Sequence, residues 1–170
     1  LLRDFSIDLE DELSLIVGKN NTGKTSILTV LNKFLNQSES NKFLFDDLNI
    51  ESKKELKDLI EDDSHFPEED FLFGIKLKIF IKYNSSDNLS NISKVMMDLD
   101  PESDIIVLGL EYVLDLNNYE LLKKKYQEYK NNEKKKTEKN KDYEPRSLYD
   151  FLNKKHSDFF KIKKKSFAYD

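Results

Sequence analysis

The residues best suited to chemistry in this chain lie at positions 18–25. They read Gly-Lys-Asn-Asn-Thr-Gly-Lys-Thr, a full match to the phosphate-binding pattern G-x-x-x-x-G-K-[ST]. Gly18 and Gly23 allow the backbone to turn with positive φ and to approach phosphate groups closely. The N–H groups of such a loop point into one concavity at a helix N-terminus, where the helix dipole favours negative charge. The pattern therefore predicts that this loop binds the phosphates of a nucleotide.

Two side chains at the end of the loop are suited to the reacting phosphate. Lys24 can reach the β- and γ-phosphate oxygens and neutralise the charge that builds up as the γ-phosphoryl group leaves. Thr25 offers a hydroxyl to Mg²⁺. We therefore predict Lys24 as the catalytic residue, Thr25 as the metal ligand, and ATP with Mg²⁺ as the cofactors. The residues predicted to contact the nucleotide are Gly18, Lys19, Asn20, Asn21, Thr22, Gly23, Lys24, Thr25 and Ser26.

The segments on either side of the loop are those that such a site needs. Residues 13–17 (Leu-Ser-Leu-Ile-Val) predict a short buried strand that runs into the loop. Upstream, apolar and polar residues alternate over positions 5–10, which predicts a half-buried strand. After the loop, apolar residues at three- and four-residue spacing predict an amphipathic helix from Lys24. They are Ile27, Leu28, Leu31, Phe34 and Leu35. This context favours a nucleotide site over a glycine-rich turn before an ordinary helix.

The remaining residues predict a sheet and three more helices. Residues 52–60 predict a short helix, and residues 71–83 and 105–116 predict two strands. The first of these strands alternates apolar residues with lysines, as in an antiparallel sheet with one side in water. A lysine-rich helix is predicted from 119 to about 141, and a further helical stripe from 148 to the chain end. We therefore expect an α/β fold with a mixed or antiparallel sheet, in which residues 117–145 form a lysine-rich, helical and partly disordered insertion.

Composition narrows the class of protein. The 170 residues are 38% hydrophobic and 36% charged, enough for a core with a strongly solvated surface. The lack of cysteine excludes disulfides and thiolate metal sites and suits a cytoplasmic setting. No apolar run approaches the roughly 20 residues of a membrane span. A net charge of −5 argues against a nucleic-acid surface over the whole chain. The lysine-rich stretches 123–141 and 154–165 are interpreted as solvated helix faces, with a basic face for DNA as the alternative.

The region around the loop resembles the start of the SMC/RecF-type ABC ATPases, and most closely the OLD (overcoming lysogenization defect) ATPases. Asn20 matches the asparagine at the third loop position of the broad group, whereas Asn21 with Thr22 matches the OLD-like subset. The specific match covers about residues 5–35. Together with a start on Leu1 in a predicted strand, it implies that residues 1–170 form the N-terminal lobe of a larger ABC-type P-loop NTPase head.

The resemblance also implies a mode of action. In this family two heads sandwich the nucleotides, so ATP would act as a switch for dimerisation and hydrolysis would reset it. The implied partners are ATP, a second copy of the chain, and DNA contacted through other regions, with no membrane. DNA processing or phage defence would be the role, in some relatives through an attached nuclease domain.

Other parts of the family site are not readable in the sequence. Asp98, at the end of Val-Met-Met-Asp, is the nearest match to a Walker B aspartate, but a solvated strand end is the favoured interpretation. Asp98 and Asp100 also have the spacing of a Toprim metal pair, and Asp115 is interpreted as a strand end. Neither Gln37 nor Gln127 can be assigned to a Q-loop. The two histidines, His65 and His156, lack the spacing of a ligand set and are interpreted as surface residues.

Two other classes of protein stay open. A stand-alone regulatory module could bind ATP without turnover, which the missing Walker B motif would fit. A different P-loop enzyme, such as a small-molecule kinase, would need an acceptor site that the sequence does not reveal. A GTPase is disfavoured, because the Asn-Lys pairs at 32–33 and 140–141 fail the spacing of a guanine-reading Asn-Lys-x-Asp.

Overall fold

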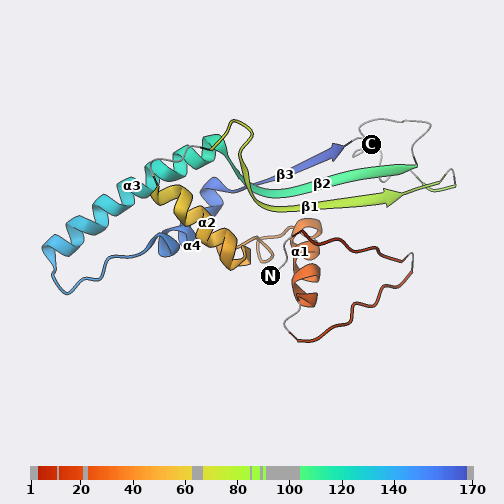
Figure 1. The fold of residues 1–170 in the computed structure, drawn as a ribbon, viewed down its shortest axis with the longest axis horizontal. Coiled ribbons are helices and arrows are strands. Elements are labelled where there is room, and N and C mark those ends of the chain that lie inside the picture. Colours follow the sequence, from red (N-terminus) through yellow and green to blue (C-terminus); the bar gives the residue numbers. More distant parts are fainter. Residues whose placement is uncertain are drawn as a thin grey trace. The chain divides into compact units, whose positions relative to one another are not determined.

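The computed structural model describes residues 4–10, 12–20, 23–62, 67–84, 86–88, 90 and 104–167 (Figure 1). The chain divides into two compact units, Leu1–Asp62 and Asp63–Asp170. The described residues form four α-helices and a three-stranded antiparallel sheet. The expected α/β fold with an antiparallel sheet is therefore confirmed for this part of the chain.

The first unit contains two helices joined by a short 3₁₀ turn. Helix α1 spans Lys24–Leu35, the turn η1 spans Phe45–Asp47, and α2 spans Ile50–Glu61. Both α-helices were predicted from their apolar spacing. The Phe34 ring at the end of α1 packs against Phe43 with ring centroids 4.6 Å apart, and both side chains are buried. Since aromatic burial of this kind is a large stabilising term, this pair fixes the C-terminal half of α1.

The two strands predicted before the loop are absent. Residues 4–10 and 12–19 have no strand structure, and Leu13, Leu15 and Val17 are 81%, 83% and 78% exposed. The prediction of a buried strand was therefore wrong for this chain. A strand is stable only when its N–H and C=O groups pair with a neighbour, and no described segment pairs with these residues.

The second unit is built on the sheet. Strand β1 spans Leu72–Lys82, β2 spans Ile105–Asp115 and β3 spans Lys161–Phe167, in the order β1-β2-β3. Leu77 lies opposite Leu110, and Leu110 lies opposite Lys164. The central strand β2 is almost entirely buried, whereas β1 exposes every second residue in its second half. These bounds confirm the strands predicted at 71–83 and 105–116.

Strand β3 corrects the prediction that the last helix runs to the end of the chain. Helix α4 spans Leu148–Phe159, and the chain then becomes extended. The apolar residues of the helical stripe end at Phe160, which is buried and stacks on Tyr112 of β2. The following Lys-Ile-Lys-Lys-Lys-Ser-Phe segment pairs with the open edge of β2, because this satisfies backbone groups that would otherwise lack a partner.

Helix α3, Leu116–Lys139, and α4 form a helical hairpin at one end of the sheet (Figure 1). Their contact is aromatic, with Tyr126 and Phe151 at 5.7 Å between ring centroids. The helix predicted from 119 to about 141 is confirmed, since it ends at Lys139, and most of its residues after Tyr129 are exposed. Whether residues 117–145 form an insertion stays a prediction.

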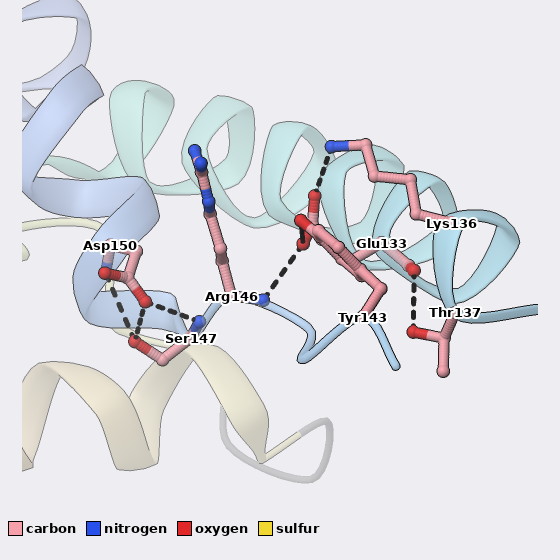
Figure 2. Close-up of polar contacts among 7 residues, drawn as sticks. All are labelled: Glu133, Lys136, Thr137, Tyr143, Arg146, Ser147 and Asp150. Atoms are coloured by element: carbon pink, nitrogen blue, oxygen red, sulfur yellow. Dashed lines mark hydrogen bonds and ion pairs between the residues drawn. The ribbon is translucent and has the colours of Figure 1, made fainter. Parts of the chain in front are cut away.

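A buried carboxylate, Glu133, holds this second half of α3 in place (Figure 2). Glu133 accepts hydrogen bonds from Lys136 Nζ (2.6 Å), the Tyr143 hydroxyl (2.7 Å) and the Arg146 backbone N–H (2.9 Å). The backbone N–H of Arg146, followed by Lys136 and Tyr143, lowers the pKa of Glu133 to about 2. One charged side chain thus joins the end of α3 to the connection that leads into α4.

Candidate nucleotide-binding loop

The turn into α1 depends on Gly23. Its backbone has φ 90° and ψ 6°, in the left-handed region, and it is the N-cap residue of the helix. The Gly23 carbonyl accepts the first helical hydrogen bond, from the Ile27 N–H at 3.2 Å. A residue with a Cβ is strained in this region, so the sequence needs glycine here. The predicted positive φ is confirmed at Gly23.

The N-terminus of α1 is suited to an anion. Its N-cap residue, Gly23, has no side chain that could cap the first N–H groups. The first turn contains no acidic residue, and Thr25 is exposed. The first N–H groups of a helix lack intrahelical partners and carry the positive end of its dipole. Ile27 and Phe34 are the buried side chains of this helix and hold it against the rest of the unit. The helix is therefore fixed through its apolar side, while its first turn presents donors.

Lys24 folds back over the loop. Its ammonium donates to the Gly18 carbonyl at 2.5 Å and to the Lys19 carbonyl at 2.6 Å. The Lys24 side chain is partly exposed. An ammonium has three donor hydrogens, so one remains for a phosphate oxygen. Lys24 thus connects the start of the loop to its end and places its charge at the loop.

The other predicted loop residues fall into three groups. Gly18, Lys19 and Asn20 are exposed, Ser26 is partly buried, and Asn21 and Thr22 lie outside the described residues. Gly18 does not have the positive φ that we expected. Among the described glycines, Gly23 and Gly74 have a positive φ. Among the described loop residues the positive φ lies at Gly23, so the expected role of Gly18 reduces to close approach.

The residues present fit ATP with Mg²⁺. The loop offers backbone donors and the Lys24 ammonium for phosphate oxygens, and the exposed Thr25 for the metal. Mg²⁺ at nucleotide sites takes few protein ligands and completes its shell with phosphate oxygens and water. Among the described residues, no cluster of three or more His, Cys, Asp or Glu side chains could hold a metal ion.

The remaining predicted candidates do not add to the loop. Asp98, Asp100 and His65 lie outside the described residues. Asp115 ends β2, as predicted, and caps α3 by accepting from the Asn118 N–H at 3.0 Å. It also accepts from Lys163 at 2.8 Å, and these partners lower its pKa, with Lys163 the largest cause. Asp115 is therefore a structural residue.

His156 corrects a prediction. We expected a surface histidine, but its side chain is 8% exposed and lies in α4, with Nδ1 3.1 Å from the Leu152 carbonyl oxygen. Its ring also meets Tyr112 edge to face at 6.5 Å. The apolar stripe of α4 runs through position 156, and that spacing was the signal for burial. Gln37, the first Q-loop candidate, donates to the Phe34 carbonyl at 3.3 Å.

Comparison with known families now places the chain in a class. The family model described as an AAA ATPase domain matches residues 1–170, so the chain belongs to the AAA ATPase domain family. Neither the curated proteins nor the solved structures give a match. None of the helices in the described part of the chain is both long and apolar enough to span a membrane.

Proposed function

We propose that this chain binds Mg²⁺-ATP at residues 18–26 and contributes the P-loop of an ATPase head. The observation that carries the proposal is the arrangement of Gly23 and Lys24 at the start of α1. A left-handed glycine, an uncapped helix N-terminus and an ammonium held over the loop together present donors to a polyphosphate. Membership of the AAA ATPase domain family supports ATP as the nucleotide and hydrolysis as the reaction.

Each of these residues has a defined task in the proposed reaction. The first N–H groups of α1 bind the phosphates, and the Lys24 ammonium stabilises charge on the β- and γ-phosphate oxygens. The Thr25 hydroxyl would hold Mg²⁺. Bound Mg²⁺ would supply further neutralisation of the phosphate charge. A residue that positions the attacking water is not assigned.

The finer proposal is an OLD-type or RecF/SMC-like ABC head that works as a homodimer on DNA in the cytoplasm. It is supported by the loop sequence, in which Asn20, Asn21 and Thr22 match the OLD-like pattern. The exposed apolar residues of 13–17 also support a head completed by further sheet strands. Attached nuclease activity is proposed from the resemblance alone.

The experiment measures ATP hydrolysis and ATP-dependent dimerisation for the full-length wild-type protein and for its Lys24→Ala variant. We expect loss of phosphate release and of ATP-dependent dimerisation, since the variant lacks the charge that meets the γ-phosphate. Lys42→Ala is the matched control, because this exposed lysine lies in the same unit and forms a surface ion pair with Glu39. Equal ATP turnover in the Lys24 variant and the control would contradict the proposal.

A regulatory module that binds ATP without turnover is the second candidate. It is favoured by the lack of an assignable Walker B carboxylate among the described residues, where Asp115 is committed to the α3 cap. In that case the wild-type protein would bind ATP and dimerise but release no phosphate, and Lys24→Ala would still abolish binding.

A further inference from the structure

The antiparallel sheet has one face that gathers basic and aromatic side chains. Residues directly opposite each other in neighbouring strands share a face, and successive residues alternate between faces. The strand register therefore assigns one set of residues to a single surface. The set is Lys76, Lys78, Phe80 and Lys82 of β1, Val107, Gly109, Glu111 and Asp115 of β2, and Lys161, Lys163, Lys165 and Phe167 of β3.

The lysines on this face form two rows. One row runs along β1 and the other along β3. Across the strands, Glu111 of β2 lies between Lys76 and Lys163, and Gly109 of β2 lies between Lys78 and Lys165. Adjacent strands are about 4.8 Å apart and alternate residues about 6.8 Å apart along a strand. The rows on β1 and β3 therefore run side by side about 10 Å apart, with β2 as the floor between them.

The face is positive although the whole chain is negative. It carries six lysines and two carboxylates, Glu111 and Asp115, and Asp115 accepts a hydrogen bond from Lys163 at 2.8 Å. Glu111 is 7% exposed, and its Oε2 forms an ion pair with the Lys165 ammonium at 3.0 Å. Lys76 and Lys78, both exposed, have no carboxylate partner within the described part of the chain. The charges of these two lysines are thus available to an anionic ligand, whereas Lys82, Lys163 and Lys165 have carboxylate partners.

Two phenylalanines lie among these lysines, at the register position after Lys78 and Lys165. Phe80 and Phe167 both pair with Val107, so they share this register position, and they are 60% and 37% exposed. The Phe167 ring crosses Gly109, where a Cβ would collide with it. The Lys78 ammonium lies 5.3 Å from the centre of the same ring. Exposed rings on a flat sheet next to lysines are suited to stacking with planar groups.

We propose that this face binds single-stranded nucleic acid. The lysine rows would contact phosphates along the strand, and Phe80 and Phe167 would stack on bases, a combination that typifies single-strand recognition. A duplex hides the faces of its bases, so it could use the lysines but not the rings. The inference deepens the finer proposal of a head that works on DNA by naming a surface and the single-stranded form, and it is independent of the loop, because the surface consists of residues in the second unit and binding needs no nucleotide.

The test is fluorescence anisotropy of labelled oligothymidine and oligouridine with the full chain, across a series of salt concentrations. We expect Lys76→Ala/Lys78→Ala to reduce the slope of log affinity against log salt by about 1.4, since each phosphate contact on a single strand contributes about 0.7. Phe80→Ala should weaken binding roughly fivefold or more, and Phe80→Tyr should restore it because the ring is kept. Lys134→Ala/Lys135→Ala on α3 removes the same charge from an exposed helix face and is the control.

The outcomes separate the possible ligands. Tighter binding of oligothymidine than oligouridine would identify DNA, the reverse would identify RNA, and either supports the proposal. Binding that drops equally in the α3 control and the sheet variants, or that is unaffected by Phe80→Ala, would overturn it. A preference for duplex or for anionic vesicles over single strands would overturn it as well. Titrating ATP into Lys76→Ala/Lys78→Ala tests the loop separately, and unchanged ATP affinity is expected.

Discussion

Replacing Gly23 tests whether the conformation of the loop sets its affinity for nucleotide. Gly23 has φ 90°, and an L-residue in the left-handed region costs about 1–2 kcal/mol. That free energy makes the loop conformation about 5- to 30-fold less populated. Since apparent affinity falls with the fraction of competent molecules, Gly23→Ala should weaken Mg²⁺-ATP binding by at least this factor. Contact between the new Cβ and the phosphates would add to the loss.

Three substitutions of Gly23, to Asn, Ala and Val, should weaken ATP binding by different amounts. Asn tolerates the left-handed region better than Ala, whereas Val is worse because it is β-branched. Calorimetric ATP affinities should therefore fall in the order Gly, Asn, Ala, Val, and thermal stability should follow the same order. Gly18→Ala serves as the comparison for stability, because Gly18 has no positive φ and its substitution should leave the melting temperature unchanged. An affinity for Gly23→Val equal to wild type would refute the reasoning.

Two further predictions concern the second unit. Glu133 has a pKa of about 2 in the folded state against an ordinary 4.5, so its ionised form stabilises the fold above about pH 4.5 and this contribution is lost as pH falls towards 2. In chemical denaturation at a series of pH values, Glu133→Gln should flatten the loss of stability in that window; an unchanged pH dependence would contradict the assigned role. Gly74→Ala places a Cβ against the Tyr112 carbonyl at φ 148°, whereas a Cβ at Gly109 meets only the ring of Phe167, which can move. Gly74→Ala should therefore cost about 1–3 kcal/mol of unfolding free energy, and more than Gly109→Ala, a difference that equilibrium denaturation measures.

The elements that carry their own apolar pattern were predictable from sequence. The stripe that includes Ile27 and Phe34 gave α1, and the lysine alternation in β1 gave a strand with one side in water. These patterns are local, because burial of one face decides both the element and its orientation. The turn at Gly23 was also predictable, since the motif places a glycine where the backbone needs positive φ.

The predictions that failed depended on partners distant in the sequence. Residues 13–17 have a strand composition, but a strand also needs a neighbour to pair with. Strand β3 has a composition dominated by lysine, and only its pairing with β2 makes it extended. Glu133 had no signal at all, because its partners Tyr143 and Arg146 reach it through the return of the chain after α3.

The same reasoning applies to the candidate site. The motif named Lys24 and its neighbours, but it did not reveal that the ammonium is held by the Gly18 and Lys19 carbonyls. The β1 part of the basic face could be predicted from sequence, since the lysines of β1 alternate clearly with apolar residues. Those of β3 were assigned to a helix, and the register with β2 was needed to place both sets on one surface.

Nucleotide binding at residues 18–26 can be measured by calorimetric titration with a non-hydrolysable ATP analogue, with and without Mg²⁺ and in parallel with GTP. We expect binding at one site per chain that strengthens with Mg²⁺, favours ATP over GTP, and disappears in Lys24→Ala. Binding of equal strength in wild type and Lys24→Ala would contradict the proposed nucleotide site, because the nucleotide would then not be held by this loop.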